Sequence, residues 1–238
     1  MLNVIPWIST SRDFPAVDTA RTDPNGLLCT GADLAPETII AAYSRGIFPW
    51  FSDGQPILWW SPDPRMVLFP EEFKISKSLA KTVNRKPFEV RFDSAFSEVI
   101  SACSEPRRED GGTWIVPDMR AAYAALHARG VAHSIESWRE GKLVGGLYGL
   151  ALGRIFFGES MFARETDASK VALVALVEKL KHDGFELIDC QQETRHLASF
   201  GARPIPRREF VQRLKVLINS QQPNSVWRAT GPESDVKA

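Results

Sequence analysis

Residues 154–192 constrain the fold most, because their pattern predicts a strand, a helix and a second strand in close succession. The second strand, FELIDCQQ, ends with Asp189 and Gln191 on one face and Cys190 on the other. A carboxylate at the end of an otherwise apolar strand costs free energy unless it is paired, hydrated or used in a reaction. The first strand, RIFFGESMFA, carries a second carboxylate, Glu159. The pattern therefore predicts a reaction site where these two strands lie side by side.

The connecting segment predicts a helix over about 168–182, which Asp167 is placed to cap and Gly184 is placed to end. Upstream, residues 133–163 alternate and contain a Gly-Lys turn and a Gly-Arg turn, which predicts an antiparallel meander. This order of strands, helix and strand resembles the GNAT fold of acyltransferases. In that fold the acyl donor lies in a notch between the two central strands. We therefore expect an α/β (α+β) protein with a GNAT-like domain built on a central mixed sheet.

The loop before the predicted helix bears on the acyl donor. In GNAT proteins that use acetyl-CoA this loop is rich in glycine, so that bare backbone N–H groups reach the pyrophosphate. Here the loop reads ARETDAS, with no glycine and two acids. A CoA donor is therefore not expected, and we expect no cofactor and no metal.

Five stretches of the chain share a family pattern. They are PNGLLCTGADL (24–34), AAYSRGIFPWFSDGQPILWWSPDPR (41–65), GTWIVPDMRAAY (112–123), GESMFAR (158–164) and LIDCQ (187–191). Together they resemble the bacterial leucyl/phenylalanyl-tRNA–protein transferases, over nearly the whole chain from about 14 to 217. Ala32 stands where the family pattern has the second glycine of a Gly-Gly-Asp-Leu run, and the residues after Trp227 match no known pattern.

The resemblance implies a reaction. Leu or Phe, and less well Met, moves from an aminoacyl-tRNA to the free α-amine of a protein that begins with Arg or Lys. The products are a peptide bond and free tRNA, and the new N-terminus marks the protein for N-end-rule degradation. Aminolysis of an activated ester needs no ATP. The enzyme has to hold two substrates together, present a neutral amine and stabilise an oxyanion. We expect direct transfer without a covalent enzyme intermediate.

The resemblance also implies that Asp189 and Gln191 are catalytic. A free α-amine has a pKa near 8 and loses a proton before it attacks. Asp189, acting through or with Gln191, is the candidate for that step, and a desolvated carboxyl with a raised pKa suits it. Whether Asp189 takes the proton or orients Gln191 and the amine stays open. The residues alone also permit an aspartate that caps a following helix near 193–199.

Glu159 is a candidate for binding a cation, either the donor's α-ammonium or the acceptor's Arg or Lys side chain. The alternative is a structural ion pair with Arg154 or Arg164. Strand alternation predicts that Glu159 and Met161 share one face and that Ser160 lies on the other.

A donor side-chain pocket is expected to be apolar and adaptable, because Leu, Phe and Met share an unbranched β-carbon. Its candidate lining residues, each of which could also be plain core, are Phe156, Met161, Leu173 and Leu176. The aromatic candidates for stacking on the 3′-terminal adenosine or for closing the pocket are Trp50, Trp114, Tyr43 and Tyr123. His196, which follows the Asp189 strand, could reach the site, but a surface or capping role is the ordinary expectation for such a histidine.

Lys77, Lys81 and Arg85 fall at helical spacing on one face of a helix predicted near 76–85, with no acidic residue interleaved. The ordinary interpretation is a solvated helix face. In the family that this chain resembles, the same helix carries a basic cluster that binds tRNA. The resemblance therefore implies contacts to phosphate that depend on salt and not on sequence.

The composition is that of an ordinary globular protein, since 44% of the 238 residues are apolar and 24% are charged. We expect a small N-terminal domain over 1–64, a GNAT-like transferase domain over 65–228 and a flexible tail over 229–238. The three scattered cysteines suit a reducing compartment, and no apolar run is long enough to span a membrane. We expect a cytoplasmic monomer whose partners are aminoacyl-tRNA and protein substrates.

Two alternative functions stay open. One is a GNAT-like acyltransferase with another donor, and the other is a non-catalytic tRNA-binding module. The net charge of zero argues against attraction of the whole molecule to nucleic acid, so tRNA binding depends on the local stripe.

Overall fold

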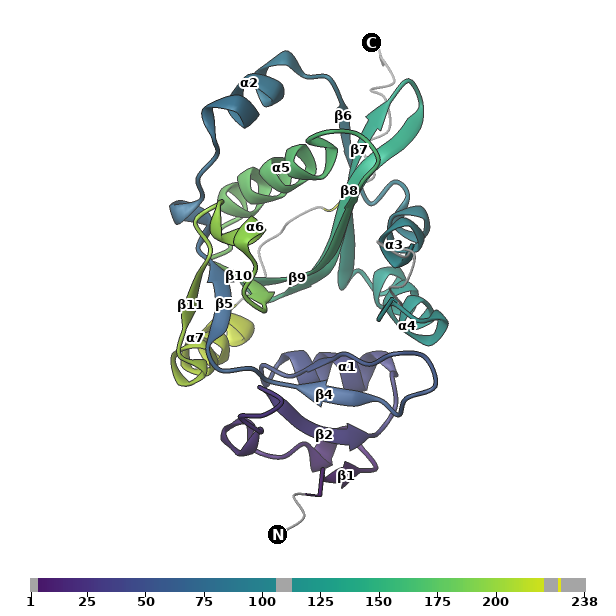
Figure 1. Cartoon of the computed structure of the whole chain (residues 1–238), viewed down its shortest axis with the longest axis vertical. Helices are drawn as coiled ribbons and strands as arrows, with labels where there is room; N and C mark the ends of the chain where they lie inside the picture. The colour runs from purple at the N-terminus through teal and green to yellow at the C-terminus, as the bar shows by residue number, and fades with distance from the viewer. Residues whose placement is uncertain (1–3, 106–112, 221–226, 228–238) are drawn as a thin grey trace.

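The computed structural model describes residues 4–105, 113–220 and 227, and its strands form two sheets (Figure 1). The smaller sheet has the strand order β1-β2-β4-β3. Its strands are β1 (Trp7–Ile8), β2 (Leu27–Gly31), β3 (Phe48–Pro49) and β4 (Leu58–Trp60). The larger sheet has the order β11-β5-β10-β9-β8-β7-β6. Its strands are β5 (Arg65–Leu68), β6 (Glu89–Phe92), β7 (Ala132–Arg139), β8 (Lys142–Leu152), β9 (Ile155–Ala163), β10 (Leu187–Gln191) and β11 (Arg203–Ile205).

The α-helices lie between and around the sheets. They are α1 (Pro36–Tyr43), α2 (Lys77–Arg85), α3 (Phe96–Ser104), α4 (Pro117–Ala128), α5 (Ala168–His182), α6 (Arg195–Ala198) and α7 (Arg207–Asn219). Even the longest, α5, has only 15 residues. Within the described ranges, no helix is both long and apolar enough to cross a membrane.

The larger sheet is mixed, as predicted. Strands β6 to β9 form the antiparallel meander, β10 returns parallel to β9 after α5, and β5 pairs antiparallel with β10. A parallel neighbour requires a crossover of a dozen or more residues, and α5 provides it. The mixed α/β class and the strand, helix, strand order expected of a GNAT-like domain are therefore confirmed.

Helices cover both faces of this sheet (Figure 1). One core cluster joins α5 and α2 to strand residues such as Phe156 and Ile188. The other joins α1, α3, α4 and α7 to residues such as Phe157 and Leu187. Neighbouring residues of one strand thus enter different clusters, because side chains alternate across a strand. The candidate site residues of β9 and β10 can reach either side of the sheet.

The ends of α5 confirm the predicted helix with one difference. Gly184 follows the helix with a positive φ of 76°, the conformation that favours glycine at this position. Asp167 occupies the N-cap position but has φ 65°, and its side chain makes no capping hydrogen bond. Its carboxylate instead accepts from Lys170 Nζ at 2.7 Å and from Thr82 Oγ1 at 3.3 Å. The predicted cap is therefore wrong in its chemistry, because these two partners hold the carboxylate.

A β-bulge in β9 overturns the predicted alternation. Tyr148 of β8 pairs with Ser160, whereas the next residue, Gly149, pairs with Gly158, so that Glu159 is one residue too many on β9. Such an insertion shifts all later side chains to the opposite face. Met161 consequently packs on the α5 side, while the Glu159 carboxylate lies on the other side. The prediction that these two residues share a face is wrong.

The loop after β2 contains Ala32, the residue that departs from the family pattern. Ala32 has φ 56°, in the left-handed region that glycine adopts at little cost. Its N–H donates to Ile8 O at 2.8 Å, which ties the loop after β2 to β1. The division at residues 64 and 65 stays a prediction, although the larger sheet begins at Arg65. The predicted tail over 229–238 lies outside the described residues.

Candidate active site

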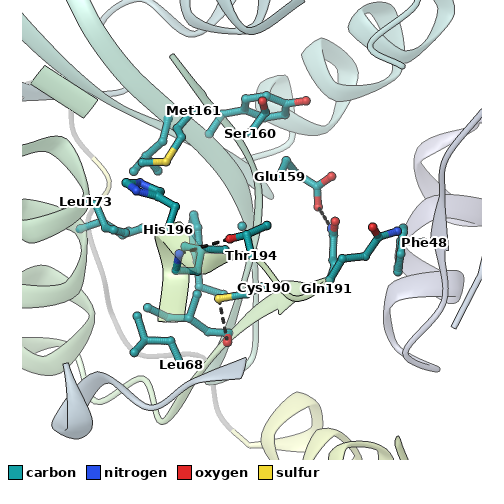
Figure 2. A pocket seen from close by; sticks show the side chains of 18 of the residues that line it. Phe48, Leu68, Glu159, Ser160, Met161, Leu173, Cys190, Gln191, Thr194 and His196 are labelled. Carbon is teal, nitrogen blue, oxygen red and sulfur yellow. Dashed lines mark hydrogen bonds between the residues drawn. The ribbon is translucent and has the colours of Figure 1, made fainter. Parts of the chain in front are cut away.

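A pocket of about 560 Å³ opens over β9 and β10 beside α5 (Figure 2). This volume lies within the range of small-molecule sites, roughly 300–1,000 Å³. Most of the predicted catalytic and substrate-binding residues line it, namely Phe156, Glu159, Met161, Leu173, Leu176, Gln191, Trp50 and Trp114. The remaining three, Asp189, Tyr43 and Tyr123, lie behind the surface and bind Glu159 or Gln191.

The apolar wall of the pocket consists of Phe156, Met161, Leu173 and Leu176. These residues belong to the α5-side core or pack against it, so their positions are fixed by the fold. In Figure 2, Met161 and Leu173 border the cavity on the side away from Glu159. A wall of Leu, Phe and a flexible Met suits an unbranched apolar side chain.

Glu159 receives three neutral hydrogen-bond donors. The hydroxyls of Tyr43 and Tyr123 lie 2.8 Å from its Oε1 and Oε2, and Gln191 Nε2 lies 3.0 Å from Oε1. Burial is the main influence on this carboxyl and raises its pKa from 4.5 to about 7, although the tyrosine hydroxyls oppose the rise. Glu159 therefore exchanges a proton readily near neutral pH.

Among the residues that the structure describes, Glu159 forms no ion pair with Arg154 or Arg164. Arg154 instead binds Glu186 at 3.4 Å, and Arg164 binds Glu105 at 2.7 Å. That alternative is therefore wrong, and the burial of Glu159 is not offset by either arginine.

Tyr43 and Tyr123 are fully buried, with no exposed surface. Neither ring is available to stack on an adenine, so that prediction is wrong for these two residues. Burial raises the pKa of both hydroxyls well above the ordinary value, which keeps them protonated. A buried phenol needs a hydrogen-bond partner, and Glu159 provides it for both.

Asp189 is fully buried and is held by Arg65. Arg65 Nε donates to Oδ1 at 2.8 Å and Nη2 donates to Oδ2 at 2.6 Å. The guanidinium lies between the rings of Phe48 and Phe210, 4.8 and 4.7 Å from their centroids. Its Nη1 also donates to the Gly46 carbonyl at 3.2 Å. This ion pair joins the N-terminal region, β5, β10 and α7.

The geometry favours an orienting role for Asp189. Besides Arg65, its Oδ1 accepts the backbone N–H of Gln191 at 2.9 Å. Gln191 has φ 62°, a left-handed conformation that costs free energy unless its surroundings hold it. Asp189 therefore fixes Gln191 and is itself shielded from the pocket. The helix-capping alternative is wrong, because Thr194 Oγ1 caps α6 through Leu197 N at 3.2 Å.

The polar side chains connected to Glu159 and Asp189 are called the polar cluster below. They are Arg65, Asp189, Gln191, Glu159, Tyr43 and Tyr123.

Two further residues, His196 and Arg65, shape the site. His196 lines the pocket, and Figure 2 shows its ring near Met161 and Leu173. Desolvation lowers its pKa, so the ring is neutral at physiological pH. His196 is also exposed, so the expected surface position is confirmed, and the same side chain borders the pocket. Arg65 was missed because nothing in the sequence links it to a residue 124 positions away.

Lys77, Lys81 and Arg85, the basic stripe, are exposed on α2. This helix rests on α5 through its buried residue Leu79 and projects at the edge of the molecule (Figure 1). In the part of the chain that the structure describes, no carboxylate forms a salt bridge with these three side chains. The stripe is therefore free to bind an anionic partner.

Two family models match the chain. The model described as leucyl/phenylalanyl-tRNA protein transferase matches residues 67–215, and the one described as its N-terminal domain matches residues 32–63. Among solved structures, the match to L-PGS from Bacillus licheniformis covers 75% of this chain and 62% of the L-PGS chain. The two sequences are 14% identical and the TM-score is 0.37. So distant a likeness adds nothing to the function.

Curated relatives named leucyl/phenylalanyl-tRNA–protein transferase are much closer. The chain is 58% identical to that of Nitrosospira multiformis over 94% of this chain and 97% of the relative. It is 56% identical to that of Chromobacterium violaceum over 94% of this chain and 96% of the relative. The relative from Pseudomonas entomophila is 60% identical over 89% of this chain and 94% of the relative. This chain belongs to the leucyl/phenylalanyl-tRNA–protein transferase family.

Proposed function

We propose that this protein transfers Leu or Phe from an aminoacyl-tRNA to the α-amino group at the N-terminus of a protein. One observation carries the proposal for this chain. Glu159 and Gln191 bind each other at the surface of a pocket whose opposite wall is apolar. Groups able to handle an amine thus face groups able to hold the donor side chain, at one cavity.

The donor is proposed to bind with its side chain against the apolar wall. Trp50 and Trp114 line the same pocket, and Trp50 is 38% exposed. Either ring is accessible for stacking on the 3′-terminal adenosine, which contributes roughly 1–3 kcal/mol per base. The wall suits Leu and Phe, and the flexible Met161 suits a Met donor as a third substrate.

Gln191 is proposed to receive the acceptor amine. Its Nε2 donates to Glu159, which leaves the amide Oε1 as an acceptor for an N–H of the amine. Glu159 takes a proton from the incoming α-ammonium, and its pKa of about 7 suits that step at neutral pH. Asp189 and Arg65 act through Gln191, which they hold in position.

The bond changes follow from aminolysis of an ester. The neutral amine attacks the ester carbon, the bond from that carbon to the ribose 3′-oxygen breaks, and a peptide bond forms. The nitrogen gives up two protons in all. One ends on the 3′-oxygen of the released tRNA and the other returns to water. Holding both reactants in one pocket supplies much of the rate enhancement.

The tRNA body is proposed to bind the basic stripe, where Lys77, Lys81 and Arg85 are exposed and free of ion pairs among the described residues. The acceptors are proposed to be proteins that begin with Arg or Lys, which the transferred residue then marks for N-end-rule degradation. We further propose that the small domain covers residues 1–64 and that the enzyme acts as a cytoplasmic monomer.

The test is transfer of labelled Phe and Leu from their tRNAs to short peptides that begin with Arg, Lys or Ala. Transfer to the Arg and Lys peptides but not to the Ala peptide is the expected result. No transfer with tRNA still bound would favour a binding module. Labelling from acetyl-CoA in place of aminoacyl-tRNA would favour an acyltransferase with another donor.

A further inference from the structure

Tyr43, Tyr123 and Glu159 form a closed ring of contacts. The two hydroxyls lie 2.8 Å from the two Glu159 oxygens, and the hydroxyl oxygens lie 2.7 Å from each other. Each of these three contacts needs one hydrogen between its oxygen atoms. The tyrosines supply two hydrogens, so the third has to come from a protonated Glu159. When Glu159 is ionised, both tyrosine hydrogens go to the carboxylate and stabilise its charge, and when Glu159 is protonated its own hydrogen completes the ring.

Only one member of the ring reaches the pocket. Tyr43 on α1 and Tyr123 on α4 are fully buried, whereas Glu159 lines the cavity. Figure 2 shows the Glu159 carboxylate directed toward Gln191, the residue proposed to receive the amine. A proton from the pocket therefore enters the ring through Glu159.

We propose that Tyr43 and Tyr123 are positioning residues of the transfer reaction, which complete a ring that stores the proton taken by Glu159 from the acceptor amine. This inference rests on the proposed function. Neither tyrosine touches a substrate. The first proton lost by the nitrogen stays in the ring until the product leaves and water takes it. The second proton, lost after attack, ends on the 3′-oxygen of the tRNA.

The other groups that face Glu159 are few among the described residues. They are Tyr148 on β8, Asp189 on β10 and Arg65 on β5. The negative charge of Asp189 and the positive charge of Arg65 act in opposite directions on the Glu159 carboxyl, and the two are paired. Loss of one tyrosine hydroxyl is therefore the cleanest change that can be made to the ring.

The experiment uses Tyr43→Phe and Tyr123→Phe, which keep the aromatic ring and remove one hydroxyl each. Tyr148→Phe is the matched control, because Tyr148 is equally buried and its hydroxyl has no hydrogen-bond partner in the described part of the chain. Its ring lies 5.4 Å from that of Tyr123. The measured quantity is the single-turnover rate of Phe transfer from bound Phe-tRNA to a peptide with N-terminal Arg, between about pH 5.5 and 8.5.

Each substitution removes a hydroxyl that donates to the ionised carboxylate of Glu159. The pKa of Glu159 should therefore rise, so that it becomes an effective base only at higher pH. The midpoint of the rate profile should rise by about one pH unit in Tyr43→Phe and Tyr123→Phe. It should stay at the wild-type value in Tyr148→Phe. At the highest pH the rates of both ring variants should approach the wild-type rate, while thermal unfolding shows that each variant is folded.

Unchanged midpoints in both ring variants would overturn the proposal, and so would an equal shift in Tyr148→Phe. A loss of rate that is the same at every pH would also overturn it, because structural damage gives that result. Absence of transfer by the wild-type protein would instead mark failure of the proposed function itself.

Discussion

The two sides of strands β9 and β10 are built in different ways. On one side the polar cluster places charged and hydroxyl groups among buried aromatic rings, and Asp189 is enclosed completely. On the other side the apolar wall borders an open cavity of about 560 Å³. Adjacent residues of one strand, such as Ile188 and Asp189, serve the two sides. The groups proposed for reaction and those proposed for selecting the donor thus come from opposite faces of the two strands, and both border the same pocket.

The difference implies different tolerance to substitution. A buried polar group that loses its partner costs far more than an apolar group of altered shape. Changes in the polar cluster should therefore lower the rate for every donor alike. Changes in the apolar wall should alter the preference among donors.

The largest effect is expected from Arg65→Lys. Lysine keeps the charge but cannot form the two parallel hydrogen bonds to Asp189, so Gln191 loses its fixed position. The single-turnover rate should fall by about 100-fold or more for both Leu and Phe, in the lower part of the range for acid–base groups. Affinity for tRNA, measured by filter binding, should stay within about twofold.

Arg203→Lys is the matched control for this change. Arg203 also forms two hydrogen bonds to one carboxylate, that of Glu72, and also lies over a ring, that of Phe69, at 4.6 Å. It lies on β11 of the same sheet, is half exposed and does not line the pocket. A wild-type rate for Arg65→Lys, or an equal loss for Arg203→Lys, would contradict the role given to Arg65.

A third region, the basic stripe, should change affinity without changing the rate of the bound complex. Replacing Lys77, Lys81 and Arg85 with Ala removes the three proposed contacts to phosphate. The slope of log K against log salt should flatten by about 2 to 3, and binding should weaken by roughly ten- to a hundredfold. The charge-matched control replaces the exposed residues Arg12, Arg208 and Lys215. An unchanged slope in the stripe variant would mean that the stripe is a solvated helix face.

Leu173→Phe tests the apolar wall of the pocket. The added ring occupies part of the cavity beside Met161 and leaves less room for an aromatic donor. The ratio of kcat/KM for Phe-tRNA to that for Leu-tRNA should fall by about tenfold. An equal loss for both donors, or a large drop in Tm, would indicate overpacking of the core and would not support a selecting wall.

The smallest effect is expected from Ala32→Gly, which touches neither side of the sheet. Ala32 has φ 56°, and a left-handed conformation is strained for residues other than glycine. Glycine should raise the free energy of unfolding by up to about 1 kcal/mol and leave transfer unchanged. Urea denaturation measures this, and a lower stability would show that the loop does not strain Ala32.

Local pattern predicted much of this fold and part of the site. The apolar pattern of residues 187–191 predicted β10, whose register nevertheless shifts between Asp189 and Gln191, and the limits of α5 followed from its apolar spacing and Gly184. The bulge at Glu159 was missed, because it depends on how β9 pairs with β8 and leaves no local signal.

The partners of the site residues could not be predicted either. Arg65 meets Asp189 across 124 positions, and Tyr43 meets Glu159 across 116. Contacts at such separation are fixed by the packing of α1, β5, β9 and β10 and not by spacing along the chain. The residue types were therefore within reach of the sequence, whereas the faces of the residues around the bulge and the hydrogen-bond partners were not.

The most direct test of the reacting side is Glu159→Gln, measured as the single-turnover rate at saturating Phe-tRNA and peptide. Wild-type Glu159 has a pKa of about 7, so its carboxylate form, and with it the rate, should increase as pH rises through that value. At pH 8 the variant should be slower by about 100-fold or more, with unchanged tRNA affinity and without that rise. A variant that transfers Phe at the wild-type rate, with the same pH profile, would contradict the assignment of the reaction to the polar cluster.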